Sequence, residues 1–201
     1  MLQIKAHIFI LKGKDTKFSF ILRCYIFLIL FFMFFSGSQV YGADSQKFGE
    51  YELKAAFIFN FAKFVTWPEH HFSVRKNTID LCVYGSGFPI NTFNYFEGKT
   101  AQGQIFRTKR LKDLSAVDGC DMLFVCASER YRITQIINKV KDMPILTIGD
   151  TEGFGEKGVM INLYIEDDKV RFEINLDAAK DAGLFISSQL LKLGRIIQKK
   201  R

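Results

Sequence analysis

The sequence has few of the residues that build metal centres and catalytic sites. It contains three histidines and four cysteines in 201 residues, and no two cysteines are spaced as CxxC. Structural zinc sites draw their ligands from such pairs and from histidine, so we expect no metal-binding residues. No GxSxG nucleophile elbow is present either. The absence of these patterns predicts a protein that is not an enzyme and needs no cofactor.

The glycine turn "YGSGFP", residues 84–89, is the nearest approach to a phosphate-binding motif. It lacks the third glycine of a dinucleotide fingerprint and the lysine of a P-loop. Two glycines at this position usually make only a turn. The alternative is a small-ligand site, in which the backbone N–H groups of the turn would bind a phosphate.

Residues that could take part in catalysis occur elsewhere, but no sequence motif places a nucleophile near them. His70 and His71 follow a predicted helix in "WPEHHFS", where we expect an exposed polar turn. The carboxylates that occur in pairs are Asp118, Asp121, Asp150 and Glu152. Carboxylates at loop ends normally cap helices or remain solvated, and this is the expectation for these four.

Positive charge is scarce in the part of the chain that we expect to fold. The net charge is +7, but residues before 43 carry five cations (Lys5, Lys12, Lys14, Lys17, Arg23) against Asp15. That segment therefore contributes +4, which leaves +3 for the rest (7 − 4). A nucleic-acid binder concentrates basic residues in its folded domain, so we expect no nucleic-acid partner.

Residues 1–42 have the composition of a signal peptide. The run 25–35 has eleven residues without charge, Arg23 precedes it, and small residues follow, with cleavage expected near Gly42–Ala43. The alternative is a membrane anchor, but eleven helical residues reach only about 16 Å, roughly half of a hydrocarbon core. We therefore expect export with cleavage, and no stable membrane insertion afterwards.

Residues 43–201 are expected to form one domain, because no repeat or linker interrupts them. The predicted helices are 46–67, 91–97, 129–140, 177–183 and 187–197, and the predicted strands are 78–85, 104–111, 121–127, 145–149, 159–165 and 169–176. This order predicts an α/β fold, in which a mixed and mostly central sheet is flanked by helices. The last two strands, joined by the acidic turn 166–168, are expected to form an antiparallel hairpin at one edge.

The first predicted helix is apolar almost all round, whereas a surface helix needs only one apolar stripe. Burial on several sides is the simple explanation. The alternative is that Phe57, Phe61 and Phe64 dock on a partner or on a second copy of the chain.

Three cysteines remain after cleavage, so one pair and one free thiol are expected in an oxidising compartment. Cys82 lies within a predicted strand and Cys120 just before another, and neighbouring strands bring such residues within disulfide distance. The favoured pair is Cys82–Cys120. The rival is Cys82–Cys126, which would leave Cys120 free.

Five segments of the sequence form a recognisable series: "ELKAAFIFNFAKFVTWP", "LCVYG", "GCDMLFV", "PILTIGDTEGFGEKGVMINLYI" and "VRFEINLDAAKDAGLFISSQLLKLGRII". Together they resemble the YfiR/HmsC-like family of secreted bacterial proteins. The resemblance covers about residues 50–197 and implies an α/β domain in the periplasm, often dimeric. It also implies a repressor, which binds the periplasmic part of an inner-membrane diguanylate cyclase and thereby lowers cyclic-di-GMP, exopolysaccharide and biofilm.

The resemblance also bears on single residues. It implies that the cysteines of "LCVYG" and "GCDML" pair, which supports Cys82–Cys120, whereas the cysteines that some members carry in the glycine-loop region are missing here. It places the cyclase-binding face near "RFEINLDAA", which predicts that Phe172, Glu173 and Asn175 bind the partner. The alternative for Glu173 and Asn175 is ordinary strand-end polarity, with Asn175 capping the next helix.

The glycine loop 149–158 is then expected to be a recognition surface beside that junction. A different function remains open, namely a periplasmic module that binds a small molecule and signals to a membrane receptor or histidine kinase. In that case "YGSGFP" or the glycine loop would line the pocket.

Overall fold

The structure is a computed structural model that describes residues 43–69, 71–72 and 77–198. The expected signal peptide, residues 1–42, and His70 lie outside these ranges. The described residues from Gln46 onward belong to one compact unit. Among the helices of the described residues, none combines the length and apolar composition that crossing a membrane requires.

The first helix, α3 (Ala43–Phe64), begins and ends three residues earlier than predicted. Gln102 stops it, because its side-chain amide donates hydrogen bonds to the carbonyl oxygens of Ala62 (2.7 Å) and Val65 (2.6 Å). These carbonyls lie at the helix end, where no intrahelical donor is available. The chain then forms the short strand β1 (Val65–Thr66).

Within the part of the chain that the structure describes, ten strands form two sheets. The larger one has the order β10–β8–β7–β6–β5–β2–β4–β3, and β1 pairs with β9 in the smaller one. The strands not yet introduced are β2 (Thr78–Tyr84), β3 (Thr100–Ala101), β4 (Gln104–Leu111), β5 (Met122–Val125), β6 (Leu146–Gly149), β7 (Ile161–Glu166), β8 (Lys169–Asn175), β9 (Phe185–Ile186) and β10 (Arg195–Ile197).

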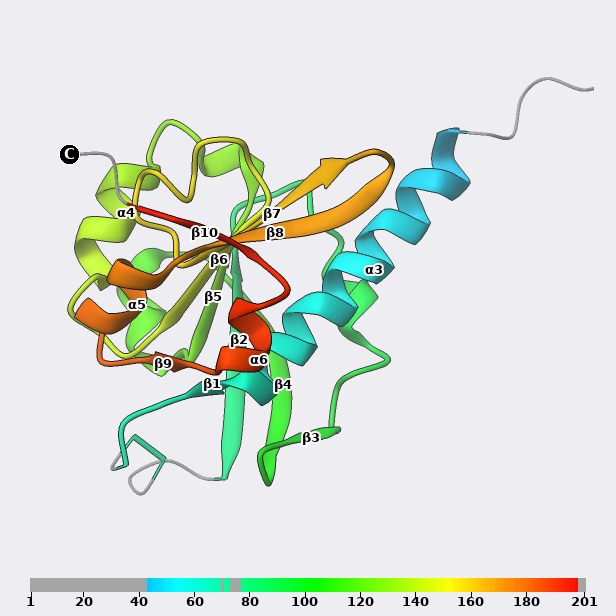
Figure 1. Cartoon of the computed structure of the whole chain (residues 1–201). Helices are drawn as coiled ribbons and strands as arrows, with labels where there is room; N and C mark the ends of the chain where they lie inside the picture. The colour runs from blue at the N-terminus through cyan, green and yellow to red at the C-terminus, as the bar shows by residue number, and fades with distance from the viewer. Residues whose placement is uncertain (1–42, 70, 73–76, 199–201) are drawn as a thin grey trace, which may run out of the picture. The chain divides into compact units, whose positions relative to one another are not determined.

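The large sheet is mixed, as predicted. Strands β4, β2, β5, β6 and β7 run parallel to one another, whereas β8 returns antiparallel to β7 and β3 is antiparallel to β4. The β7–β8 hairpin extends toward α3 (Figure 1). The α/β class, the mixed sheet and the hairpin are confirmed, although β10 beyond β8 makes the hairpin the penultimate pair rather than the edge.

Alternating side chains of the central strands fill two apolar layers, one on each face of the sheet. Leu81 and Phe124 belong to the layer that includes the residues of α3. Cys82 and Leu123, their neighbours in sequence, belong to the layer that includes α4 (Ile133–Val140). Central parallel strands are therefore buried on both faces, which explains their nearly continuous apolar sequence.

Burial explains the unusual composition of α3. Phe61 is fully buried, and the rings of Phe57 and Phe61 lie 5.9 Å and 5.1 Å from the ring of Phe172 on β8. The phenylalanine face thus packs inside its own domain.

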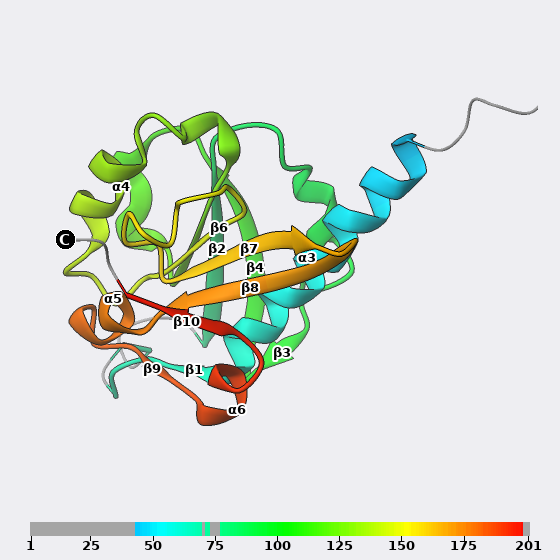
Figure 2. The ribbon, with the colours of Figure 1, turned by 45° about the horizontal axis from the view of Figure 1, so that its top comes forward.

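The C-terminal segment differs most from the prediction. Instead of one helix over 187–197, it forms the single turn α6 (Ser188–Leu191), a bend at Gly194 and strand β10, which pairs in parallel with β8 (Figure 2). A Cβ on Gly194 would lie 2.5 Å from the Phe172 ring, so only glycine lets the chain approach β8 here.

The remaining helices are shorter than predicted. The segment expected as 129–140 is divided into the 3₁₀ turn η3 (Ala127–Glu129) and α4, and the segment 91–97 into η1 (Ile90–Phe93) and turns. A further 3₁₀ turn, η2 (Leu114–Gly119), precedes β5. The helix α5 (Leu176–Asp181) follows β8 at the expected place.

Candidate functional site

Three polar side chains form a row across the strands β7, β8 and β10. Asn162 and Glu173 are register partners, and so are Glu173 and Arg195. Asn162 Nδ2 donates to Glu173 Oε1 at 3.1 Å, and Arg195 donates to Glu173 Oε2 at 2.6 Å. The register of the sheet therefore brings together three residues that lie far apart in the sequence.

Glu173 is the buried centre of this row. Its side chain is only 8 % exposed, whereas that of Arg195 is 60 % exposed. The hydrogen bond to Glu173 raises the pKa of Arg195 above its usual value. The Arg195 guanidinium also lies 4.9 Å from the Tyr164 ring. Its position is therefore fixed by both a carboxylate and an aromatic face.

The glycine loop 149–158 lies beside the row and contacts it. Asn175 Nδ2 donates to the carbonyl oxygen of Gly155 at 3.0 Å, and a Cβ on Gly155 would lie 2.7 Å from Glu173 Oε1. The buried Phe154 ring anchors the loop in the apolar layer around α4. The loop is thus fixed to β8 by a glycine contact, a hydrogen bond and one aromatic side chain.

The same loop is tied to α3 at its start. Lys54 Nζ lies 3.0 Å from Asp150 and 2.6 Å from Glu50. Burial lowers the pKa of Lys54, but the charge of Asp150 and the hydrogen bonds to Glu50 and Asp150 outweigh it, so the net result is a raised pKa. Lys54 therefore stays charged and connects the helix to the loop.

The three residues predicted to bind a partner are all buried. Phe172 is 4 % exposed, Glu173 6 % and Asn175 0 %. Asn175 caps α5, because its side-chain oxygen accepts from Ala178 N at 3.0 Å. Glu173 and Asn175 thus lie beneath the surface that Arg195 and the loop present, whereas Phe172 packs in the apolar layer that includes the residues of α3.

Sequence reasoning missed Asn162 and Arg195. Nothing in "VMINLYI" or "LKLGRII" marks either residue, since only the strand register places them beside Glu173. The amide oxygen of Asn162 is buried and accepts no hydrogen bond from the described residues. Such an acceptor costs about 1–3 kcal/mol if it stays unsatisfied.

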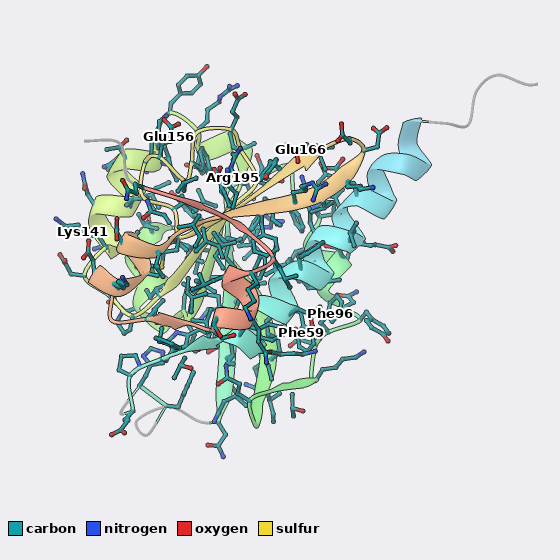
Figure 3. All side chains as sticks on the ribbon, in the orientation of Figure 1. Phe59, Phe96, Lys141, Glu156, Glu166 and Arg195 are labelled. Carbon is teal, nitrogen blue, oxygen red and sulfur yellow. A yellow bond between two sulfur atoms is a disulfide. The ribbon has the colours of Figure 1, made fainter. Side chains whose placement is uncertain are left out.

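A groove of about 510 Å³ lies over this row. Its lining residues are Asp150, Glu152, Gly153, Glu156, Asn162, Leu163, Tyr164, Ile165, Glu166, Glu173 and Arg195. Figure 3 places Glu156, Arg195 and Glu166 along the same side of the domain, away from Phe59 and Phe96. Strand β7 thus forms much of the floor, and the glycine loop forms one wall.

Cys82 and Cys120 are joined by a disulfide with a Cα–Cα distance of 5.8 Å, which is the pairing that the sequence favoured. Cys126 is a buried free thiol, and burial raises its pKa. The bridge closes a 38-residue separation between β2 and the start of β5 and lies on the layer around α4. It therefore supports the sheet rather than the groove.

His71 and Asp121 correct the expectation of exposed polar residues. The side chain of His71 is 9 % exposed and that of Asp121 0 % exposed, with Nε2 2.6 Å from Oδ1. Asp121 also accepts a hydrogen bond from Asp80 N at 2.7 Å. The pair was misread because Trp67 and Phe72, which pack beside His71, cover a turn that looks polar in sequence.

The backbone of "YGSGFP" is engaged within the domain. Arg110 donates to the carbonyl oxygens of Gly85 and Phe88, and Ser86 N donates to Ser128 Oγ at 2.9 Å. Among the described residues, no cluster of three His, Cys, Asp or Glu side chains could hold a metal ion.

Comparison with known proteins gives one family. The family model described as YfiR/HmsC-like matches residues 51–195. No curated protein matches the chain in sequence.

Two of the solved structures that are similar to the chain are each 13 % identical to it in sequence. The ABC domain in complex with L-Trp from Streptococcus pneumonia has a TM-score of 0.41, over 64 % of this chain and 60 % of that one. A conserved domain protein from Vibrio cholerae O1 biovar El Tor has a TM-score of 0.43, over 73 % and 59 %. The chain thus spans about three fifths of each, and neither likeness bears on its function.

Proposed function

Because this chain belongs to the YfiR/HmsC-like family, we propose that it is a periplasmic repressor of an inner-membrane diguanylate cyclase. Family membership implies a regulator of diguanylate cyclase signalling in the periplasm. The finer proposal is that this chain binds the sensory part of the cyclase, holds it inactive and lowers cyclic-di-GMP and biofilm output. Residues 1–42 would direct it there as a cleaved signal peptide, leaving residues 43–201 as the domain.

The observation that carries the proposal is the family match over residues 51–195, together with the groove that the buried row supports. We propose that Phe172, Glu173 and Asn175 serve binding indirectly. Glu173 orients Arg195, and Asn175 holds the carbonyl of Gly155, so the outer surface of the loop and β10 keeps one shape. A preorganised surface loses less conformational entropy on binding, which raises affinity.

Repression follows from a difference in affinity. A binding protein can hold its partner inactive only if it binds the inactive conformation more tightly than the active one. A shift from almost fully active to almost fully inactive requires about 10⁴-fold preference, or about 5.5 kcal/mol. Any signal that releases the cyclase has to reduce this preference.

The test is the cellular level of cyclic-di-GMP in the native host, with and without the gene. We expect a rise on deletion that is reversed by the exported protein but not by a copy without residues 1–42. An unchanged level on deletion would overturn the proposal.

A second function has one specific observation in its favour. A cavity of about 390 Å³ lies between α4, α5 and the end of the glycine loop, with Ile137, Met160 and Gly158 among its lining residues. It would suit a small molecule with an apolar part, as a ligand-sensing module for a membrane receptor requires. Ligand-dependent thermal stabilisation with unchanged cyclic-di-GMP on deletion would favour this function over repression.

A further inference from the structure

A second groove, of about 610 Å³, lies between the C-terminal half of α3 and the segment 95–100, which leads from η1 into β3. Its lining residues are Phe59, Asn60, Lys63, Tyr95, Phe96, Gly98, Lys99 and Thr100. Figure 3 shows Phe59 and Phe96 side by side in this part of the domain, away from Arg195 and Glu156 of the groove beside the glycine loop. The surface that the proposed function uses therefore does not include this second groove.

A series of aromatic rings leads from the core of the domain to the rim of this groove. Phe59 is buried, and its ring lies 5.1 Å from that of Phe106 and stacks on Phe96 at 4.8 Å. The Phe96 ring contacts Tyr95 at 5.1 Å, and Tyr95 is 73 % exposed. Because the inner rings are held by the core, the outer ones offer apolar area to a partner at a low cost in conformational entropy.

The charge of the groove is an observation independent of its rings. Among the described residues that line it, the only charged ones are Lys63 and Lys99. Lys63 Nζ lies 4.6 Å from the centroid of the Phe59 ring and donates to Asn60 Oδ1 at 2.9 Å, and Lys99 Nζ lies 3.2 Å from the centroid of the Tyr95 ring. Neither ammonium has a carboxylate partner among the residues that the structure describes. The groove therefore carries two positive charges that no neighbouring acid neutralises.

Neighbouring hydrogen bonds preserve this charge and the shape of the groove. The nearest acid in the sequence, Glu97, accepts from Thr108 N at 2.9 Å and from Thr108 Oγ1 at 2.7 Å, so its carboxylate is bound to β4. Gln102, directly after β3, donates to the carbonyl oxygens of Ala62 and Val65 and so ties one wall of the groove to the other. A preorganised cationic surface with aromatic faces favours an anionic partner that also has an apolar part.

We propose that this groove binds an acidic peptide segment of a partner protein, in which two carboxylates flank an aromatic or aliphatic side chain. The carboxylates accept hydrogen bonds from Lys63 and Lys99, and the side chain between them packs on Phe59 and Tyr95. An anionic membrane has the same charge, but a groove between two elements fits a peptide chain, whereas a bilayer needs a protruding surface. This interface is separate from the one that Arg195 supports, so it does not depend on the proposed function.

The direct test uses N-acetyl-Glu-Phe-Glu amide as the probe and N-acetyl-Gln-Phe-Gln amide as its neutral match. Each is titrated into the isotopically labelled exported protein, with the disulfide intact, while NMR follows the backbone amides of Gly98 and Thr100. We expect saturable shifts with the acidic probe, with a Kd on the order of millimolar for so short a peptide. Added salt should weaken this binding, because exposed ion pairs are screened. Equal affinities for the two probes would overturn the proposal.

Variants locate the site. We expect Lys99→Gln and Tyr95→Ser each to weaken binding of the acidic probe about threefold, since each removes one exposed contact. Tyr131→Ser is the matched control, because Tyr131 is 90 % exposed, has the Arg130 guanidinium 5.5 Å from its ring and lies outside the groove. It should leave the affinity unchanged, and equal losses for Tyr131→Ser and Tyr95→Ser would overturn the location.

Reversal of the charge gives a gain of binding, which a misfolded variant would not show. The double variant Lys63→Glu/Lys99→Glu should lose affinity for the acidic probe and bind N-acetyl-Lys-Phe-Lys amide instead, whereas wild type should not bind that basic peptide. A double variant that retains the affinity of wild type for the acidic probe would overturn the role of the two lysines. The single variant Lys99→Gln tests the same role with a smaller change in charge.

Lipid vesicles separate a peptide partner from a membrane. The exported protein is sedimented with vesicles of phosphatidylcholine alone and with vesicles that also contain phosphatidylglycerol. We expect wild type and the Lys63→Gln/Lys99→Gln variant to remain equally in the supernatant with both kinds of vesicle. Pelleting with the anionic vesicles that the double variant abolishes would overturn the peptide in favour of an anionic lipid surface.

Discussion

The carboxylate of Glu173 is almost completely buried, yet the guanidinium of Arg195 that pairs with it at 2.6 Å is largely exposed. The two residues are register partners on parallel strands, β8 and β10. Because β10 is the outermost strand of the sheet, this ion pair attaches the C-terminal edge to the domain. It also fixes a charged group at the rim of the groove.

Arg195→Gln should lower the free energy of unfolding by about 1–2 kcal/mol. The substitution leaves the buried Glu173 carboxylate with a weaker donor, and an incompletely paired buried charge is costly. Arg171→Gln is the matched control, since its partner Glu166 is about half exposed and such surface pairs contribute about 0–1 kcal/mol. Urea unfolding followed by circular dichroism measures both, and equal losses would contradict a special role for the β8–β10 pair.

Gly155→Ala should destabilise the domain by about 1–3 kcal/mol and displace the glycine loop. The new Cβ would lie 2.7 Å from Glu173 Oε1, so the loop or the carboxylate has to move. The same substitution at Gly49 of α3 meets no atom within 4 Å and should stabilise the protein by up to about 1 kcal/mol. A Gly155→Ala protein that melts at or above the temperature of the wild type would show that Gly155 is not sterically constrained.

Reduction of the Cys82–Cys120 bridge, or its replacement by two serines, should cost about 3–4 kcal/mol of stability for a 38-residue loop. Cys126 should react only slowly with iodoacetamide in the folded protein, because it is buried and its raised pKa keeps it as the thiol. Mass spectrometry after alkylation should find residue 126 modified only upon unfolding, with residues 82 and 120 modified only after reduction. Alkylation of Cys120 without reductant would contradict this pairing.

Six strands of the large sheet, β2 and β4 to β8, were predictable, because their apolar runs reflect burial on one face or on both, whereas β3 and β10 were not predicted. The prediction of a helix over 187–197 was wrong, because tertiary contacts outweigh the local helical pattern. Leu190, Leu191 and Ile197 suit a helix face, but the contact of Gly194 with Phe172 and the open side of β8 favour a strand. Two-residue strands such as β9 are too short to leave a pattern in the sequence.

The candidate site was predictable only in part. "RFEINLDAA" marked Glu173 and Asn175, but the partners of Glu173 come from strands whose register no local pattern specifies. Asn162 is eleven residues away and Arg195 is twenty-two residues away, each with an ordinary neighbourhood. A buried carboxylate in a strand is itself the signal that a donor must come from a neighbouring strand.

Gln102 is expected to stabilise the C-terminal end of α3. It lies far from that helix in the sequence, so no local pattern predicts the contact. Gln102→Ala should cost about 1–2 kcal/mol, because the carbonyl oxygens of Ala62 and Val65 lose their side-chain donor. Gln102 has a φ of 51°, which is strained for any residue except glycine, so Gln102→Gly loses the same hydrogen bonds but relieves the backbone. Gln102→Gly should therefore be less destabilised than Gln102→Ala, and the exposed Gln189→Ala should be nearly neutral. Urea unfolding of the three variants separates the two contributions. A Gln102→Ala protein as stable as Gln189→Ala would show that other groups, including water, satisfy the helix end equally well.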